Sequence, residues 1–270
     1  MSYPCLLRPG GVQPHFAARR SADVTGELHG RVVWRELRCA RLAAAGELVA
    51  ALFGWQAAPY GDGLRLCAGE RPIAAVRYAA AEGERQPRWL VHFAVEHLEP
   101  ALERAAHLGG SARSDVEVVA ELGRRALIAD PQGALCYLVE PAAAAPLQAD
   151  SATLGDFFWA ELACAEPRPA LPFYCDLLGW TAAAVPLGDL ELLMFTRGGQ
   201  RVGSAVADQD LAGGGGWISY VTVPDVRACC ERARALGAGV YRQPVSLPGR
   251  GTFAGIVDPA GARLALWQQS

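Results

Sequence analysis

Two glutamates occupy the same place in two similar stretches of the sequence, and their carboxyl groups could do acid–base chemistry. Glu36 follows Trp34 by two positions, and Glu161 follows Trp159 in the same way. Both stretches alternate in a pattern that predicts a β-strand, on which side chains two positions apart share a face. We therefore expect each glutamate to lie on the same face of its strand as the tryptophan before it.

On an inward face a carboxylate is costly unless it is hydrogen-bonded, paired or protonated. Each glutamate is therefore either tied to a backbone group, an arginine or an indole N–H and serves the fold, or it moves a proton on a bound ketone or phenol. His92 has two similar interpretations, a hydrogen-bonded core histidine or an acid–base group. The candidate catalytic residues are Glu36, His92, Glu161 and Tyr220.

The stretches around the two glutamates belong to a repeat that continues to the end of the chain. The offset between matching residues is 125 positions in the first part of the repeat and 128 in the rest. The matched residues are Trp34 with Trp159, Trp55 with Trp180, Trp89 with Trp217, and Asp130-Pro131-Gln132-Gly133-Ala134 with Asp258-Pro259-Ala260-Gly261-Ala262. A repeat of this kind predicts two like modules. We divide the chain into an N-terminal extension, 1–30, a first module, 31–142, and a second module, 151–270.

Each module is predicted to contain a strand, a helix and three strands, in that order, and this series occurs twice in the module. The first helix of each module is predicted over 43–53 and 169–178, and Gly54 or Gly179 suits the position just past its end. The tether between the modules is short and apolar, so we expect one continuous structure. The extension is either a mobile tail or an arm laid across the other module or a partner subunit.

The repeated motifs resemble the vicinal oxygen chelate superfamily, the group of glyoxalase I, bleomycin-resistance proteins and extradiol dioxygenases. The motifs are Trp159-x-Glu161-Leu162, Phe173-Tyr174 with Leu178-Gly179-Trp180, Trp217-x-x-Tyr220-x-x-Val223-x-Asp225, and Gly251-Thr252-Phe253-Ala254 before Asp258-Pro259-x-Gly261-Ala262. The resemblance covers roughly nine-tenths of the chain. It implies an α+β fold of two tandem βαβββ modules that form cupped mixed sheets. It is specific for the fold and weak for the reaction, because this fold hosts unrelated chemistries.

The resemblance also implies where a metal would bind in metal-dependent members. Their ligands are a His or Gln on a module's first strand, a residue at the start of its second half, and a Glu on its last strand. Here Tyr137 and Ala265 stand where that last Glu should be. A catalytic metal needs about three protein ligands, so we expect no metal and no cofactor. A site shared between the modules, built from Glu36, His92 and Glu161, stays open as an alternative.

Without a metal, each cup is a concave pocket lined by aromatic and apolar groups, as small-molecule sites are. The candidate substrate-binding residues are Trp34, Trp89, Tyr137, Trp159, Trp217 and Ala265. Each aromatic residue could equally be packed in a core. We expect one ligand per chain in the cup that Ala265 leaves roomier, contacted by Trp159, Glu161 and Tyr220. Module one would supply His92 and Glu36 to the same or the facing cavity.

These residues favour a metal-independent enzyme that binds a small hydrophobic, aromatic or polyketide-like metabolite. The expected reaction is a proton transfer in an isomerisation, cyclisation or elimination. The first alternative is a non-catalytic binding protein that sequesters a drug, because aromatic walls suffice for that role. The second is a metal-dependent lyase or dioxygenase.

Composition agrees with a globular protein, and the partner we expect from the predicted cups is a small hydrophobic molecule. The chain has 270 residues, of which 51% are hydrophobic and 20% are charged. A net charge of −3 offers no electrostatic reason to expect nucleic acid or an anionic membrane as a partner. The N-terminus lacks the features of a signal peptide, so we expect a cytoplasmic protein. A monomer and a homodimer are both compatible with the sequence.

Overall fold

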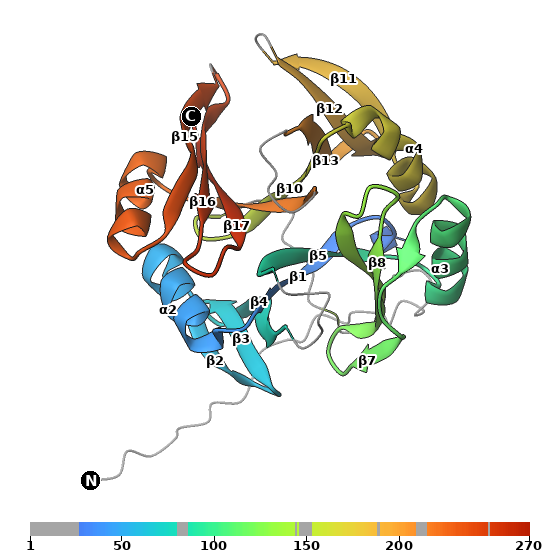
Figure 1. The fold of residues 1–270 in the computed structure, drawn as a ribbon, viewed down its shortest axis with the longest axis horizontal. Helices are drawn as coiled ribbons and strands as arrows, with labels where there is room; N and C mark the ends of the chain where they lie inside the picture. The colour runs from blue at the N-terminus through green and yellow to red at the C-terminus, as the bar shows by residue number, and fades with distance from the viewer. Residues whose placement is uncertain are drawn as a thin grey trace, which may run out of the picture.

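The computed structural model describes residues 27–79, 86–143, 145, 153–187, 190–208, 215–247 and 249–270. Within these residues the chain forms two modules of curled β-sheet flanked by helices (Figure 1). Residues 1–26 of the extension and most of the tether between the modules lie outside the described residues.

The first module is a nine-stranded mixed sheet with the order β2-β3-β4-β1-β5-β9-β8-β6, in which β7 pairs with β8. Its elements are β1 (Val32–Cys39), α2 (Leu42–Phe53), β2 (Gln56–Tyr60), β3 (Gly63–Ala68), β4 (Arg71–Tyr78), β5 (Arg88–Ala94), α3 (Leu98–His107), β6 (Ser111–Ala112), β7 (Glu117–Val119), β8 (Gly123–Ala129) and β9 (Leu135–Pro141).

The second module is an eight-stranded sheet with the equivalent order β11-β12-β13-β10-β14-β17-β16-β15. Its elements are β10 (Phe157–Cys164), α4 (Pro167–Leu178), β11 (Thr181–Leu187), β12 (Leu190–Arg197), β13 (Gln200–Ala207), β14 (Gly216–Thr222), α5 (Val226–Ala235), β15 (Gly239–Leu247), β16 (Gly251–Val257) and β17 (Arg263–Gln269). The two equivalent sheets confirm the predicted α+β fold of tandem modules.

The first helix of each module ends where the sequence predicts. Gly54 and Gly179 follow α2 and α4 with φ angles of 73° and 66°, a left-handed conformation that suits glycine. Helix α4 begins at Pro167, two residues before the predicted start. Proline is tolerated there because the first N–H groups of a helix have no partner within the helix.

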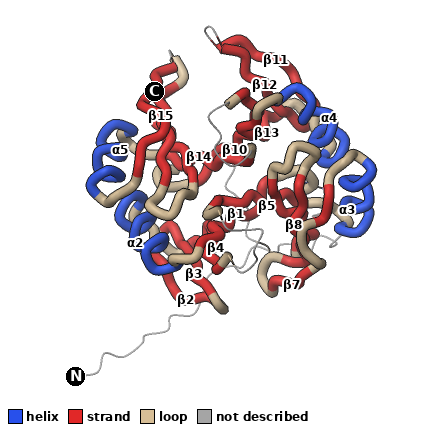
Figure 2. The backbone as a smooth tube through the Cα atoms, in the orientation of Figure 1, coloured by secondary structure: helices blue, strands red, loops and turns tan. Residues whose placement is uncertain are grey.

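The two sheets curl away from each other, the first opening towards the bottom of Figure 1 and the second towards the top. The helices lie on the flanks in two pairs, α2 beside α5 and α3 beside α4, as Figure 2 also shows. Each pair joins one helix from each module.

The hydrophobic cores also combine halves of different modules. One buried cluster joins residues of β1, α2 and β4 to residues of β14, α5, β16 and β17. A second cluster joins β5, α3, β8 and β9 to β10, α4, β12 and β13. Each half module therefore buries an apolar face against the other module, which is the arrangement expected of one continuous structure.

Polar side chains also connect the two modules along the boundary where they meet, which we call the seam. The buried guanidinium of Arg35 donates from Nε to Ser219 Oγ at 3.0 Å, and its Cζ lies 4.6 Å from the ring centroid of Phe157. The indole N–H of Trp55 donates to the carbonyl oxygen of Gly155 at 2.7 Å. The indole N–H of Trp180 donates to the carbonyl oxygen of Gly30 at 3.0 Å. Thus Gly30, the last residue of the extension, contacts module two.

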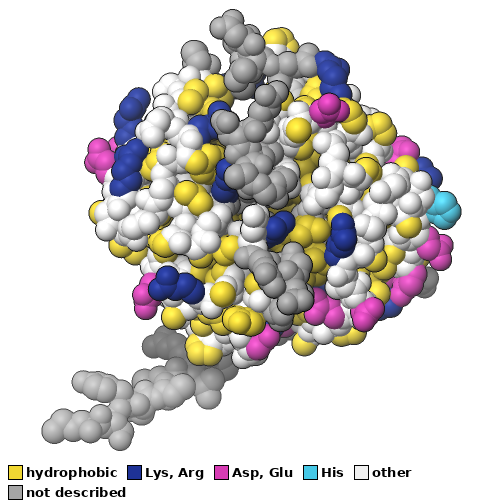
Figure 3. Space-filling model, viewed as in Figure 1, with side chains coloured by type: hydrophobic (Ala, Val, Ile, Leu, Met, Phe, Trp, Pro, Cys, Tyr) yellow, Lys and Arg dark blue, Asp and Glu magenta, His cyan; other side chains and the backbone are white. Residues whose placement is uncertain are grey.

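The face drawn in Figure 3 carries basic and acidic side chains interspersed with apolar ones. Among the described residues, no helix combines the length and the apolar character needed to cross a lipid bilayer.

Candidate functional site

The concave face of each sheet carries a row of side chains that face one another across neighbouring strands. In the second sheet the strand pairing aligns Trp159 with Tyr220, Tyr220 with Ala265, Ala265 with Gly255, and Gly255 with Arg242. In the first sheet the equivalent row is Trp34, His92, Tyr137 and Leu127. Two small residues in the second sheet therefore stand where the first sheet has a tyrosine and a leucine.

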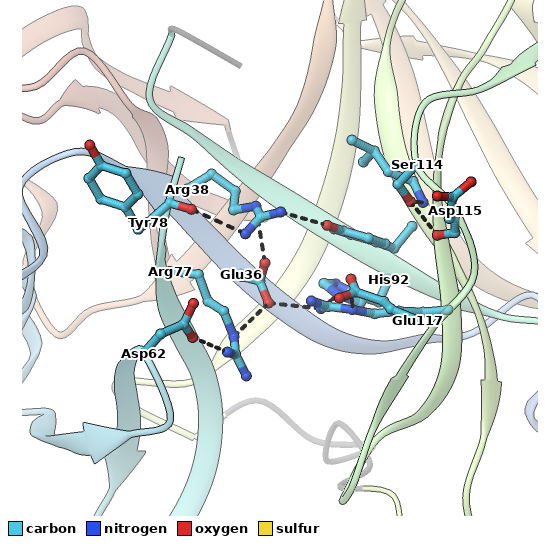
Figure 4. Close-up of polar contacts among 12 residues, drawn as sticks. Glu36, Arg38, Asp62, Arg77, Tyr78, His92, Ser114, Asp115 and Glu117 are labelled. Carbon is cyan, nitrogen blue, oxygen red and sulfur yellow. Dashed lines mark hydrogen bonds and ion pairs between the residues drawn. The ribbon is translucent and has the colours of Figure 1, made fainter. Parts of the chain in front are cut away.

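In the first sheet, arginines surround Glu36, whose side chain is only 1% exposed (Figure 4). Its Oε2 lies 2.8 Å from Nη1 of Arg125, which is 2% exposed. Arg38 Nε lies 3.3 Å from Oε1, and Arg77 Nε lies 3.7 Å from Oε2. The sequence left a structural role and an acid–base role open for Glu36. Its ion pairs with arginines favour the structural role.

His92 and Tyr137 belong to the same network. Nη1 of Arg125 lies 2.7 Å from His92 Nε2, and its Cζ lies 4.3 Å from the ring centroid of Tyr137. The rings of His92 and Tyr137 stack with centroids 4.5 Å apart. Burial, and then the charge of Arg125, hold the pKa of His92 well below its usual range. The imidazole is therefore neutral, and its ring packs against the ring of Tyr137.

Exposed carboxylates complete the charge balance at the mouth of this cup. Arg65 pairs with Glu121 at 2.6 Å, Arg77 pairs with Asp62, and Arg125 Nε donates to Glu117 Oε1 at 2.8 Å. The first cup is thus an ion-pair network rather than an apolar pocket.

A metal ion does not fit these residues. Guanidinium groups already occupy the oxygens of Glu36 and face the ring nitrogen of His92, and a second cation there would be repelled. Among the described residues, no group of three or more His, Cys, Asp or Glu side chains is placed to hold a metal. Glu36 and His92 also lie in a different sheet from Glu161, so the structure does not bring together the three ligands of the shared-site alternative.

The surroundings of Glu161 in the second sheet are different. Its Oε1 accepts a hydrogen bond from Tyr220 OH at 2.8 Å, and its Oε2 accepts one from Ser204 Oγ at 3.1 Å. The indole N–H of Trp159 donates to the same Ser204 oxygen at 2.9 Å. Burial raises the pKa of Glu161, although both hydrogen bonds oppose the shift. The hydrogen bonds to this carboxyl group therefore come from neutral donors, and the charges of Arg242 and Asp208 act on it in opposite directions.

A hollow of about 320 Å³, including its open mouth, lies against Glu161. Its walls include the apolar and aromatic residues Ile218, Tyr220, Tyr241, Phe253 and Ala265, and the charged residues Asp208 and Arg242. The first sheet has a hollow of equal volume, but that one is lined by Glu36, Arg65, Arg77 and Arg125 among others. The two volumes are about equal, but the first hollow does not lie over Tyr137, so the expectation that Ala265 leaves the second cup roomier stays a prediction. Both hollows mix charged and apolar residues, and they differ in which strands lie beneath them.

The structure separates the predicted site residues into groups. Trp34 lines the first hollow, and Trp159 supports Ser204 beside the second. Trp89 and Trp217 are a correction to the prediction, because they lie in the two hydrophobic cores. Each precedes an inward residue, His92 or Tyr220, by three positions, and an odd spacing on a strand places a side chain on the opposite face. Glu36 and His92 do not share a cavity with Glu161 and Tyr220.

Sequence reasoning missed several residues around the two glutamates. Arg38 stands two positions after Glu36, so the rule that placed Trp34 could also have placed it. Arg125 occupies the position of Phe253 in the repeat. This difference indicated that the modules had diverged, but it did not show that Arg125 is the partner of Glu36. No signal in the sequence pointed to Ser204 or Tyr241.

Comparisons with known proteins agree with this geometry. The family model described as the Glyoxalase/Bleomycin resistance protein/Dioxygenase superfamily matches residues 157–266. "Putative glyoxylase CFP32" of Mycobacterium tuberculosis is 28% identical over 241 residues, which cover 85% of this chain and 91% of the relative. "Anthracycline biosynthesis protein DnrV" of Streptomyces peucetius is 26% identical over 255 residues, covering 86% of this chain and 91% of the relative.

Solved structures share the fold at low sequence identity. The 2,3-dioxygenase LapB of a Pseudomonas species superposes with a TM-score of 0.62 at 13% identity, covering 90% of this chain and 94% of that one. The Mn(II)-bound glyoxalase of Novosphingobium aromaticivorans has a TM-score of 0.61 at 14% identity, covering 89% and 82%. In its second module the chain matches the model of the glyoxalase/bleomycin resistance protein/dioxygenase superfamily, and its two tandem modules of curled sheet share the fold of these solved structures.

Proposed function

We propose that the second cup binds a small, planar, hydrophobic metabolite and that Glu161 moves a proton on it without a metal ion. The substrate class is an aromatic or polyketide-like carbonyl compound, and the reaction is an isomerisation, a cyclisation or an elimination. Two relatives named for anthracycline biosynthesis favour this class, because anthracyclines are aromatic polyketides.

The observation that carries the proposal is the contrast between the two equivalent glutamates. Glu36 is surrounded by three guanidinium groups, whereas Glu161 accepts hydrogen bonds from two hydroxyl groups beside a hollow whose walls are partly aromatic and partly charged. An acid–base catalyst works best when its pKa lies near the operating pH, and burial shifts Glu161 in that direction. A carboxylate that only served the fold would gain more from an arginine partner, such as Glu36 has.

The roles of the neighbouring groups follow from their contacts. Tyr220 and Ser204 each donate to one oxygen of Glu161, which fixes the carboxyl plane. Trp159 fixes Ser204 in turn. The ionised carboxylate takes a proton from the carbon beside a carbonyl, and the protonated acid returns it to another atom. Glu36 and His92, two of the predicted catalytic residues, support the first module in this proposal.

Hydrogen exchange on a simple aromatic ketone tests the proposal without knowledge of the natural substrate. We would incubate β-tetralone with the full chain in heavy water and follow the loss of its α-hydrogens by NMR. The wild type should accelerate this exchange, and Glu161→Gln should reduce the rate by about 10²–10⁴-fold, the usual contribution of a general base. Glu47→Gln, an exposed position on α2, is the matched control and should leave the rate unchanged.

Calorimetric titration with β-tetralone separates catalysis from sequestration. One binding site per chain is expected, and Ala265→Tyr should abolish it by filling the hollow. Tight binding that Glu161→Gln leaves intact, with no exchange in the wild type, would instead favour the drug-sequestering alternative. The aromatic walls Tyr220, Tyr241 and Phe253 give that alternative its support. Two equivalent sites per chain would contradict the assignment to module two.

A further inference from the structure

Tyr241 lines the second hollow and takes no part in holding Glu161. It lies on β15, at the edge of the sheet, and electrostatic interactions connect it with Glu161, Asp208, Arg242 and Arg263. Within the part of the chain that the structure describes, its hydroxyl group makes no hydrogen bond. The hydroxyl group of Tyr241 can therefore donate a hydrogen bond to a ligand in the hollow beside Glu161.

The ring of Tyr241 is held in place by an unusually close approach to the backbone. A Cβ atom added to Gly255 would lie 2.4 Å from Cζ of Tyr241 and 2.7 Å from both Cε atoms. The ring therefore covers Gly255, and any larger residue there would displace it. On the ring, Arg263 Cζ lies 4.8 Å from the centroid, a cation–π contact that also fixes the ring.

Module one cannot build the same feature. The residue equivalent to Gly255 is Leu127, which is paired with Tyr137 as Gly255 is paired with Ala265. The residue equivalent to Tyr241 in the repeat is Arg113. Glu161, Tyr220 and Tyr241 therefore converge on one hollow in module two alone, and the floor between the two tyrosines is formed by two small residues.

We propose that the hydroxyl group of Tyr241 donates a hydrogen bond to the carbonyl oxygen of the ligand, opposite the carboxyl group of Glu161. This inference rests on the proposed function and narrows the substrate to a planar ketone with an acidic hydrogen on the carbon beside its carbonyl. Tyr241 is then a catalytic residue, because its donor touches the oxygen on which charge develops.

Every proton and electron pair in this step is accounted for. The C–H bond beside the carbonyl breaks, its proton forms an O–H bond on Glu161, and its electron pair moves into an enolate. The enolate oxygen is stabilised by the hydrogen bond from Tyr241. Return of the proton from Glu161 to a different carbon gives an isomer, and exchange of that proton with solvent gives the deuterated ketone. No oxidant or reductant is needed.

The protonation state of Tyr241 suits this role. Burial is the main cause that raises the pKa of Tyr241 to about 12, and the charge of Arg263 opposes it. The hydroxyl group therefore keeps its proton at neutral pH and remains a donor.

Removal of one hydroxyl group tests the inference. Tyr241→Phe retains the ring on Gly255 and should lower the rate of β-tetralone exchange by about 10²-fold, as loss of an oxyanion donor does. Tyr78→Phe, an exposed tyrosine of the first module, is the control and should leave the rate unchanged. Exchange that depends on Glu161 but is the same in Tyr241→Phe would overturn the inference and leave the proposed function standing. Exchange that depends on neither residue would count against both.

A binding measurement gives an answer that does not depend on turnover. Tetralin has the carbon skeleton of β-tetralone without the oxygen, so the ratio of the two affinities reports donation to that oxygen. The wild type should prefer the ketone, and Tyr241→Phe should reduce this preference by about fivefold. Equal affinities in the wild type, an unchanged ratio in the variant, or no binding of either compound would overturn the inference.

The glycine beneath the ring gives a second variant. Gly255→Ala should push Tyr241 away and reduce exchange as much as Tyr241→Phe does. The double variant should show no further loss, because the two changes remove the same contact. Gly216→Ala is the matched control, since an added Cβ there meets nothing within 4 Å. A Gly255→Ala protein with wild-type exchange, or a double variant with two additive losses, would contradict the placement of the ring.

Discussion

At the scale of single residues, the two equivalent glutamates have opposite surroundings. Glu36 lies among guanidinium groups, and Glu161 accepts hydrogen bonds from two hydroxyl groups. The repeat predicted that both side chains point inward, but it could not predict which side chains they would contact. Their partners come from strands that are distant in the sequence, so equal positions in a repeat do not imply equal chemistry.

The first prediction concerns the pH dependence of stability. The pKa of Glu161 is raised by burial above its ordinary value of 4.5, so between these values the folded protein binds more protons than the unfolded one. Stability therefore falls as pH rises through this window, and Glu161→Gln removes that loss. The variant should melt at the wild-type temperature near pH 4 and a few degrees higher near pH 8. Calorimetry checks this, with Glu47→Gln as a control whose difference should not vary with pH.

The second prediction concerns Arg125. Arg125→Phe, which installs the residue found at the equivalent position of module two, leaves the carboxylate of Glu36 buried without its nearest cation. It should cost about 3–5 kcal/mol in the free energy of unfolding by urea. Addition of Glu36→Gln should recover part of the loss. Arg104→Ala, which removes an exposed ion pair with Asp176, should cost less than about 1 kcal/mol. Equal losses for the two arginines would contradict a special role for Arg125.

At the scale of elements, the rows of side chains across each sheet decide where a hollow can form. Both modules use the same strand order, and both align an aromatic residue or a histidine at the centre of the row. The difference comes from two neighbouring positions: Tyr137 on β9 is equivalent to Ala265 on β17, and Leu127 on β8 is equivalent to Gly255 on β16. The smaller residues leave more room in that part of the row.

The third prediction follows from this comparison. Ala265→Tyr places in module two the side chain that module one already holds, so the sheet can accept it. The free energy of unfolding should change by less than about 1 kcal/mol, below the usual cost of overpacking a filled core. Binding of β-tetralone, measured by calorimetric titration, should be lost. Ala58→Tyr on the exposed strand β2 controls for the added ring and should bind normally. Retained binding in Ala265→Tyr would place the ligand elsewhere.

At the scale of the whole molecule, the two modules form one continuous structure, because both cores are built from halves of different modules. A separated module would expose the apolar faces that now meet at the seam. The short tether agrees with this arrangement, and Arg35 shows how the seam is specified. Its guanidinium is buried and donates to Ser219 Oγ and to the carbonyl oxygen of Trp159, both on the other module.

The fourth prediction is that thermal unfolding is one cooperative transition for both modules. Arg35→Ala should lower the free energy of unfolding by about 2–5 kcal/mol, the range for large buried side chains, and should keep a single transition. Arg227→Ala on the exposed face of α5 should change it little. Differential scanning calorimetry supplies both readouts. Two separate transitions in the wild type, or stable halves after limited proteolysis, would show that the modules fold independently.

The sequence by itself determined the repeat, the α+β fold and the inward face of Glu36, Glu161, His92 and Tyr220. These follow from periodicity and from spaced motifs, which are local properties of the chain. Only the tertiary structure decided that Trp89 and Trp217 belong to the cores, that Arg125 pairs with Glu36 in the first cup, and that Tyr241 covers Gly255 in the second. Those outcomes depend on which distant strands pair and in what register. That is the physical reason why one glutamate lies among arginines and its equivalent accepts hydrogen bonds from two hydroxyl groups.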